Sequence, residues 1–212
     1  APVCGCRAYL AVGGGFHCPA VMGSRATNIG SGFGGYQGRA LQAGDILQGH
    51  DPQHYLHRDG RSLPDALKAV PTSDWVLRVL PGPQEDQFPA ASREEFYAAV
   101  YTVSGSSDRT GVRLEGPPIA KKAGAPDSIL SEGILCGAIQ VPGDGKPIIL
   151  MNETVTGGYR KIAVVIAADL PLLGQVAPGD TVSFQKTDLA EARKLLQGVE
   201  AAVDWVRGHF AD

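Results

Sequence analysis

The amino-acid sequence predicts a mainly β protein, and three observations support this prediction. The 212 residues include 28 glycines and 15 prolines, which favour tight turns and interrupt helices. Short apolar runs recur between these turns from residue 74 to residue 186, as they do in a barrel or a sandwich. Helical periodicity is strongest in the last part of the chain. We therefore expect a barrel or sandwich followed by one long helix.

The expected strands are apolar or β-branched runs bounded by glycine and proline. They cover residues 7–12, 75–80, 101–103, 112–114, 135–141, 147–151, 162–167 and 181–185. The run WVLRVL at 75–80 is the clearest of these, because the sequence Pro-Gly-Pro stops it directly afterwards. Close, regular spacing of such runs indicates a barrel or a sandwich.

Two helices are expected beside the strands. A short one is predicted at 92–100, where Ser92 and Glu95 have the spacing of a capping box. Asp188 and Glu191 repeat this spacing ahead of a helix of about six turns. Its apolar residues recur at helical period, namely Leu195, Val199, Ala202, Val206 and Phe210.

These elements divide the chain into four expected regions. They are a glycine-rich N-terminal part (1–47), a polar connection (48–73), a β-barrel domain (74–186) and an amphipathic helix (187–212). The connection is expected to contain one helical turn at 64–69 and to be disordered, because its polar composition offers little surface to bury. The chain begins without Met and reaches a strand-like run almost at once, so we expect sequence upstream of Ala1 to be missing.

Composition argues against several classes of function. The net charge of −3 predicts no attraction to nucleic acid or to an anionic membrane, and no apolar run approaches the roughly 20 residues that span a bilayer. The four cysteines lack metal-site spacing, which favours free thiols and a cytoplasmic location. His54, His57 and Asp51 are interpreted as solvated loop residues. We therefore expect the chain to bind no metal, no nucleic acid and no membrane.

Two glycine motifs resemble nucleotide-binding loops but lack the required context. Gly30-x-Gly32-x-x-Gly35 follows no convincing strand and opens no helix. The segment GDGK at 143–146 lacks the glycine spacing and the Ser or Thr of a phosphate loop, and is interpreted as a turn between strands.

Two charged segments remain as candidate sites. Asp108, Arg109 and Arg113 lie between expected strands, where an arginine could hold a carboxylate or carboxamide, or an Asp–Arg pair could merely fix the turn. The segment TGGYRK at 156–161 either allows close approach of a ligand or forms a tight turn with exposed basic residues. The residues alone leave both pairs of alternatives open.

Several blocks resemble the allophanate hydrolase subunit 2 family, a group also described as biotin-dependent carboxyltransferase-like proteins and as the C-type subunits of 5-oxoprolinase. The blocks are SDRTGVRLEGP, GAIQVPGDGKPIIL, TGGYRKIAVVIAADLP, RAYLAVGGG, GSRAT and GFGGYQGRAL. They occur in the family order and cover nearly the whole chain, apart from the polar connection and the last helix.

The resemblance implies a cyclophilin-like β-barrel and partnership with a subunit 1-type protein. It implies a subunit of an ATP-dependent 5-oxoprolinase, which hydrolyses a lactam, with ATP acting at the level of the complex and a third lactam-utilisation subunit as a further partner. The alternatives are the carboxyltransferase component of a biotin-dependent urea carboxylase, with biotin as cofactor, and a non-catalytic regulatory subunit that binds a kinase. We expect the chain to be inactive alone.

The implied substrate is a small amide, which requires donors for its carbonyl oxygen and an acceptor for its N–H. The residues expected to supply them lie in the family blocks. The catalytic candidates are Asp108, Arg109 and Lys161, and the substrate-binding candidates are Arg113, Gln140, Tyr159, Gly157 and Gly158. We expect these side chains to converge on one cleft at one end of the barrel.

Overall fold

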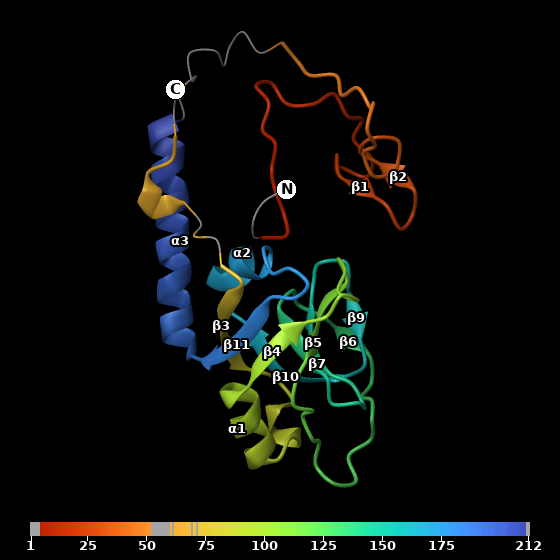
Figure 1. Ribbon diagram of the computed structural model, residues 1–212, viewed down its shortest axis with the longest axis vertical. Coiled ribbons are helices and arrows are strands. Elements are labelled where there is room, and N and C mark those ends of the chain that lie inside the picture. Colours follow the sequence, from red (N-terminus) through yellow and green to blue (C-terminus); the bar gives the residue numbers. More distant parts are fainter. Residues whose placement is uncertain (1–4, 52–59, 61, 69, 71, 211–212) are drawn as a thin grey trace. The chain divides into compact units, whose positions relative to one another are not determined.

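The computed structural model describes residues 5–51, 60, 62–68, 70 and 72–210. The chain forms two compact units (Figure 1). One is Ala8–Pro64, and the other comprises Asp65–Asp212 together with Ala1–Arg7.

The smaller unit is rich in turns and contains one short hairpin. Strands β1 (Thr27–Asn28) and β2 (Phe33–Gly34) pair antiparallel. Gly35 follows the hairpin at a φ of 48°, and an added Cβ there would lie 1.9 Å from the hydroxyl oxygen of Thr27. Only glycine fits this close approach. The Gly30–Gly35 motif thus belongs to a hairpin and opens no helix, as the sequence predicted.

The strand predicted at 7–12 is wrong. These residues are all described and form no ladder with a neighbouring strand. Tyr9 and Leu10 are 89% and 77% exposed, so the apolar run is not buried in this unit. A strand requires a hydrogen-bonding partner, which a local apolar pattern does not supply.

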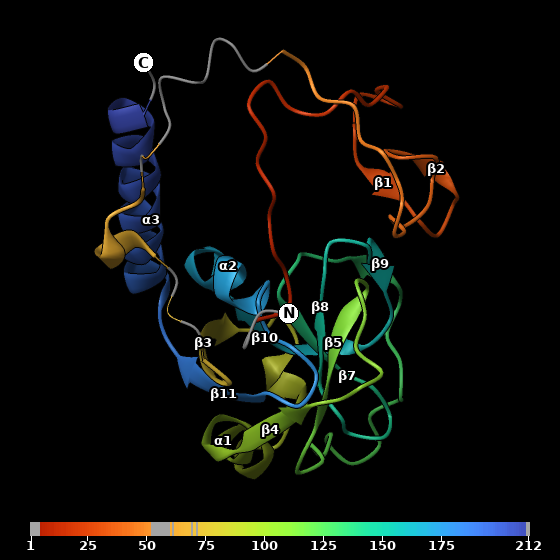
Figure 2. The same cartoon turned by 45° about the horizontal axis from the view of Figure 1, so that its top comes forward.

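The larger unit contains the predicted β-barrel (Figure 2). Its strands are β3 (Asp74–Pro81), β4 (Val100–Val103), β5 (Gly111–Glu115), β7 (Ala138–Val141), β8 (Ile148–Leu150), β10 (Arg160–Val165) and β11 (Thr181–Lys186). They close in the order β10-β3-β11-β4-β5-β8-β7. The pair of β3 and β11 is parallel, and the other neighbours are antiparallel.

Alternation of side chains along the strands fills the barrel. In β3, Trp75, Leu77 and Val79 are buried while the residues between them are more exposed, as expected for a strand with one face on the core. Strand β10 begins two residues before the predicted strand and ends at Val165, after which Ala167–Asp169 form a 3-10 helix.

A two-stranded ribbon lies outside the barrel ladder. It pairs β6 (Glu132–Gly133) with β9 (Thr156–Gly157), and Glu132 faces Gly157 in the register. The predicted strand at 135–141 is correspondingly shorter, because only 138–141 joins the barrel.

The helices differ in how they begin. Helix α1 (Ala90–Ala98) starts after Pro89 without a side-chain cap, so the predicted capping box is wrong. The helix begins earlier than expected, and Ser92 therefore lies within its first turn. Short α2 (Leu170–Leu173) follows β10, and α1 packs on the barrel through Phe96, whose ring stacks 4.7 Å from that of Phe184.

The long C-terminal helix is present as predicted. In α3 (Leu189–Phe210) the backbone N–H of Glu191 donates to Asp188 Oδ1 at 2.9 Å, which caps the first turn. Its early turns contact the barrel unit through a small cluster that includes Ala192 and Leu195. No helix within the described residues is long and apolar enough to cross a membrane.

The polar connection is only partly described. Asp65–Leu67 form a 3-10 turn, close to the turn predicted at 64–69. Residues 52–59, 61, 69 and 71 lie outside the described residues, and the expected disorder of the connection stays a prediction.

Candidate functional site

Three of the candidate residues lie at one level of the barrel. Arg113 and Gln140 both face Ile148 in the ladder, and Lys161 faces Gln140. Asp108 precedes Gly111, which pairs with Leu150 at the other end of the same strands. The register thus brings Arg113, Gln140 and Lys161 to one level, while Asp108 lies in the turn before β5, close enough for the charge of Arg113 to act on its carboxyl.

Gln140 and Lys161 form a buried polar cluster beneath the β6–β9 ribbon. They are 3% and 5% exposed. Gln140 Nε2 donates to the carbonyl oxygen of Tyr159 at 3.2 Å, and an added Cβ on Gly157 would lie 2.6 Å from the same nitrogen. The absence of a side chain at Gly157 therefore lets the ribbon close over Gln140.

Gly158 allows a second close approach beside this cluster. An added Cβ there would lie 3.1 Å from the carbonyl oxygen of Ile129. The backbone N–H of Ile129 donates to the carbonyl oxygen of Gly158 at 2.7 Å. The two glycines thus have a packing role that side chains would disturb.

Lys161 has a counter-ion in the ribbon. Its Nζ pairs with Glu132, whose Oε1 also accepts from Gln84 Nε2 at 2.9 Å. Hydrogen bonds from Lys161 and then Gln84 hold the pKa of Glu132 below its usual range. The Lys161 ammonium group, which belongs to a residue only 5% exposed, thus donates to a carboxylate of the ribbon.

Asp108 and Arg109 make local contacts in the β4–β5 loop. Asp108 Oδ1 accepts from the backbone N–H groups of Thr110 at 2.8 Å and Gly111 at 3.1 Å. Partial burial opposes ionisation of Asp108, but these donors lower its pKa overall. Arg109 Nε lies 2.8 Å from Glu153 Oε1, and both side chains are about half exposed.

Arg113 and Tyr159 line one pocket of about 360 Å³. The same pocket contains Glu115 and Lys146, which form an ion pair. The carboxylate of Glu115 raises the pKa of Lys146. This pocket therefore combines the Arg113 cation, a phenol and a paired Lys–Glu, which suits recognition of a polar amide.

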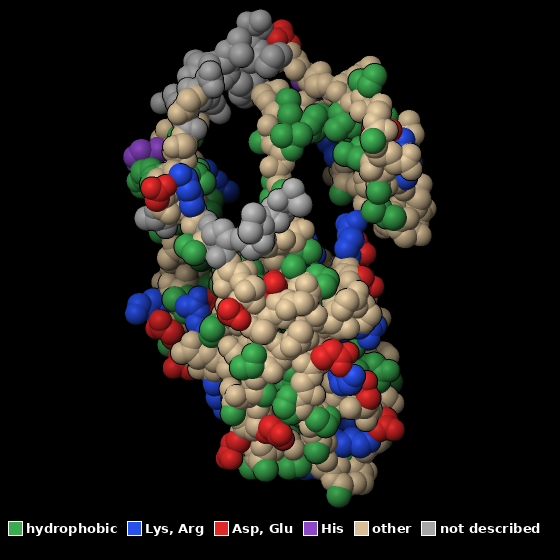
Figure 3. Space-filling view, viewed as in Figure 1, with side chains coloured by type: hydrophobic (Ala, Val, Ile, Leu, Met, Phe, Trp, Pro, Cys, Tyr) green, Lys and Arg blue, Asp and Glu red, His purple; other side chains and the backbone are tan. Residues whose placement is uncertain are grey.

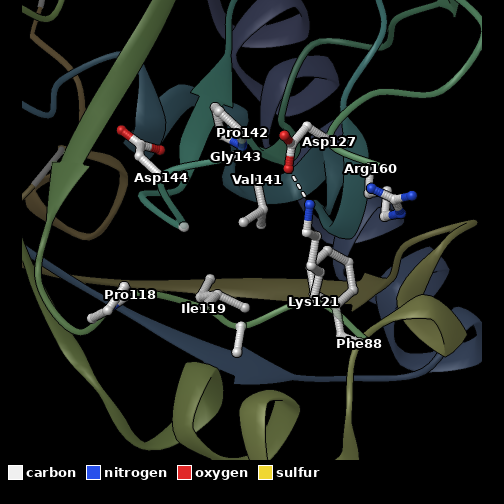
Figure 4. Close-up of a pocket in the computed structure, with 12 residues that line it drawn as sticks. Phe88, Pro118, Ile119, Lys121, Asp127, Val141, Pro142, Gly143, Asp144 and Arg160 are labelled. Carbon is white, nitrogen blue, oxygen red and sulfur yellow. Dashed lines mark hydrogen bonds and ion pairs between the residues drawn. The ribbon is translucent and has the colours of Figure 1, made fainter. Parts of the chain in front are cut away.

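A second pocket of about 350 Å³ shares Pro142 and Asp144 with the first. In Figure 4, Lys121, Asp127 and Arg160 lie together on one side of it, and Asp144 lies on the opposite side. The ion pair of Lys121 with Asp127 lowers the pKa of Asp127. The turn between the two pockets is the GDGK segment, in which the N–H of Gly145 donates to the carbonyl oxygen of Pro142 at 3.1 Å, as predicted.

Arg160 is a residue that the sequence reasoning missed. The sequence left open whether its segment meets a ligand or forms a turn with exposed basic residues, and Arg160 was not among the candidate site residues, yet it is 3% exposed and lines the second pocket. One signal was available, because Arg160 and Lys161 lead without a break into a buried strand. At a period of two, one of the two cations must point inward.

Acidic, histidine and cysteine side chains are scattered over the part of the chain that the structure describes. Within the described residues no three His, Cys, Asp or Glu side chains are grouped so that they could hold a metal ion. His54 and His57 lie outside the described residues. Acidic and basic side chains are interspersed on the barrel face seen in Figure 3.

The chain belongs to the family described as carboxyltransferase domain, subdomain A and B, which matches residues 1–186. It is 38% identical over 201 residues to the C subunit of the 5-oxoprolinase of Escherichia coli, an alignment that covers 92% of this chain and 61% of that protein. It is 39% identical to the C subunit of the 5-oxoprolinase of Haemophilus influenzae, covering 96% of this chain and 63% of that one. The chain thus spans somewhat less than two thirds of these relatives.

A solved structure shares the fold. The crystal structure of the K. lactis urea amidolyase matches with a TM-score of 0.85 and 32% identity, over 95% of this chain and 13% of that protein. The family suggested by the sequence blocks is therefore confirmed, and its relatives include 5-oxoprolinase subunits and a urea amidolyase.

Proposed function

We propose that this chain supplies the carboxyltransferase-type domain of the C subunit in an ATP-dependent 5-oxoprolinase. The observation that carries the proposal is the 38–39% identity to two proteins named as C subunits of 5-oxoprolinase, over 92–96% of this chain. The reaction would open the lactam of 5-oxoproline to give glutamate. The active unit would be a complex with a subunit 1-type partner and a third lactam-utilisation subunit.

The pocket of Arg113 and Tyr159 is the proposed site for the amide. An arginine can donate to the lactam oxygen, where negative charge develops when the ring is attacked. The tyrosine hydroxyl can donate or accept. Lys161 and Gln140 lie at the same level of the barrel, and their proposed role is to hold the Tyr159 segment and to add positive potential.

Asp108 and Arg109 are proposed to act at the edge of the site when partners are bound. Asp108 fixes the loop through backbone donors, while the half-exposed Arg109 can exchange Glu153 for a partner or substrate carboxylate. ATP is proposed to act on partner surfaces, because the GDGK segment of this chain is a turn between strands.

A second candidate function is the carboxyltransferase step of a biotin-dependent urea carboxylase. The observation that favours it is the TM-score of 0.85 to a urea amidolyase structure. Urea is also a small amide, and the same donors could bind its oxygen. Biotin would then deliver the carboxyl group from a carrier outside this chain.

A substrate comparison on the reconstituted complex separates the two candidates. The chain is combined with its genomic partner subunits and supplied with ATP and either 5-oxoproline or urea with bicarbonate and a biotinylated carrier. We expect glutamate to form from 5-oxoproline and no carboxylation of urea. Carboxylation of urea without glutamate formation would replace the first candidate with the second.

A further inference from the structure

Arg160 is a buried cation that has no counter-ion of its own among the described residues. Its Nε donates to Gln87 Oε1 and its Nη1 donates to the carbonyl oxygen of Pro126, so both partners are neutral. In the part of the chain that the structure describes, it forms no ion pair. Burying a charge is costly unless an opposite charge compensates it, so an anion would be stabilised at this site.

One donor of Arg160 is available for that anion. Its Nη2 has no hydrogen-bond partner among the described residues. Among the described residues, two buried side-chain atoms lack a hydrogen-bond partner, namely Arg93 Nε and Tyr101 Oη. Arg160 Nη2 is not one of them. Arg160 Nη2 is therefore not sealed from solvent, and Arg160 is one of the residues that line the second pocket.

Asp127 is close enough for the charge of Arg160 to lower its pKa, but its main interaction is with another residue. Asp127 pairs with Lys121 instead, and Gly143 allows the neighbouring turn to approach its carboxyl, since an added Cβ would lie 3.3 Å away. Lys121 thus holds the Asp127 carboxylate in an ion pair and leaves the guanidinium without a direct partner of opposite charge among the described residues.

The remaining wall defines the kind of anion. Phe88, Ile119 and Val141 are at most 5% exposed and line the same pocket, which suits a carbon skeleton. One cation without an ion pair matches a single negative charge, and Asp127 and Asp144 would repel a doubly charged phosphate more strongly than a singly charged carboxylate. A monocarboxylic acid with a small apolar body fits these features.

We propose that the pocket lined by Phe88, Ile119, Lys121, Asp127, Val141 and Arg160, the carboxylate pocket, binds the carboxylate of a small acid through Arg160. Choosing 5-oxoproline as that acid rests on the proposed function. The preference for a carboxylate stands on the geometry alone. Because Pro142 and Asp144 line both pockets, an acid held here would lie beside the proposed amide site.

Calorimetric titration of the chain with three probes tests this proposal. L-5-oxoproline carries carboxylate and lactam, cyclopentanecarboxylate carries only the carboxylate, and 2-pyrrolidinone carries only the lactam. We expect both acids to bind and 2-pyrrolidinone to bind at least about 10-fold more weakly, since a charge-assisted hydrogen bond is lost. Equal binding of acids and 2-pyrrolidinone, or no binding of either acid, would overturn the proposal.

Two variants and a control locate the binding site. Arg160→Gln is expected to weaken binding of both acids by about 10- to 100-fold, while Arg207→Gln on the exposed face of α3 leaves it unchanged. Asp127→Asn removes the competing anion and is expected to strengthen binding. Because the Asp127 side chain is largely exposed, Asp127→Asn is expected to fold and tests the proposal even if Arg160→Gln does not fold. Unchanged or weaker acid binding by Asp127→Asn would contradict the proposal.

The outcomes separate this inference from the proposed function. If both acids bind through Arg160 but the complex does not hydrolyse 5-oxoproline, the carboxylate pocket stands and the proposed function is wrong. If the complex hydrolyses 5-oxoproline at the same rate and KM with Arg160→Gln in place, the function stands and the assignment of 5-oxoproline to the carboxylate pocket is wrong.

Discussion

At the scale of single residues, Asp169 forms the most deeply buried charged contact described in the barrel unit. It is 0% exposed and accepts from the backbone N–H of Arg78 at 2.7 Å and from its Nε at 3.0 Å. Removing one partner of such a pair leaves an uncompensated buried group. The contact joins β3 to the segment after β10.

We expect Asp169→Ala to lower the free energy of unfolding by about 3 kcal/mol, the lower end for a broken buried pair. The lower end applies because the Arg78 side chain is 32% exposed and can turn toward water. Urea denaturation measures the change. Asp204→Ala, which breaks the exposed pair with Arg207 on α3, serves as the control and should change stability little. Equal losses in both variants would contradict this account of Asp169.

Asp108 gives a prediction about pH. Its pKa is lowered in the folded state, so its contribution to stability is present above the unfolded pKa of about 3.9 and is lost as pH falls through the folded value. We expect Asp108→Asn to lower the Tm at pH 7, and the difference from the wild type to shrink as the pH is lowered below about 4. Thermal melts across this range measure it, and a Tm difference that grows on acidification would show that the loop is not held by the carboxylate.

Arg109 allows a prediction about activity, because replacing this residue should leave the stability of the chain nearly unchanged. Its ion pair with Glu153 is exposed, and exposed pairs contribute little to stability. We expect Arg109→Ala to reduce 5-oxoproline turnover by the complex at least about 10-fold, which corresponds to roughly 1.4 kcal/mol of transition-state binding, with an unchanged Tm. Glu153→Gln breaks the same pair but keeps the arginine and should retain activity. If Arg109→Ala and the wild type turn over 5-oxoproline equally fast per folded molecule, Arg109 has only a structural role in the loop.

At the scale of elements, local pattern predicted most of the barrel strands and the long helix. Strand β3 and helix α3 have strong periodicity and clear stops, so their bounds were close to the structure. The prediction of a strand at 7–12 was wrong, because strand pairing depends on residues that are far away in the sequence. The parallel pairing of β3 with β11 was not predictable for the same reason.

The candidate site was less predictable than the fold. Residue chemistry and family blocks selected Arg113, Gln140 and Lys161, which the register brings to one level. They did not reveal that Glu132 pairs with Lys161 or that Arg160 is buried. Both facts depend on closure of a ribbon and a loop over the barrel, which is a non-local event.

The cap of α3 provides a test at this scale. Asp188 Oδ1 accepts from the N–H of Glu191, and loss of such a cap costs about 1 kcal/mol. We expect Asp188→Ala to lower the free energy of unfolding by about this amount in urea denaturation. Asp188→Asn, which keeps a capping oxygen, should recover most of it. If the asparagine variant is as unstable as the alanine variant, capping is not the cause.

At the scale of the whole molecule, the central proposal is that this chain works only as part of a larger assembly. It spans 61–63% of the length of the 5-oxoprolinase subunits that it resembles. The described residues provide two adjoining pockets whose walls carry both basic and acidic side chains, and the GDGK segment is a turn rather than a phosphate loop. Substrate polarisation is proposed to occur here, and use of ATP is proposed to occur on the partners.

The most direct measurement is the rate of glutamate formation from 5-oxoproline with ATP in three mixtures. These are the complete complex, the partner subunits without this chain, and this chain alone. We predict sustained turnover only in the complete complex, and a loss of that turnover when Arg113→Ala replaces the wild-type chain. Equal rates with and without this chain would contradict the account.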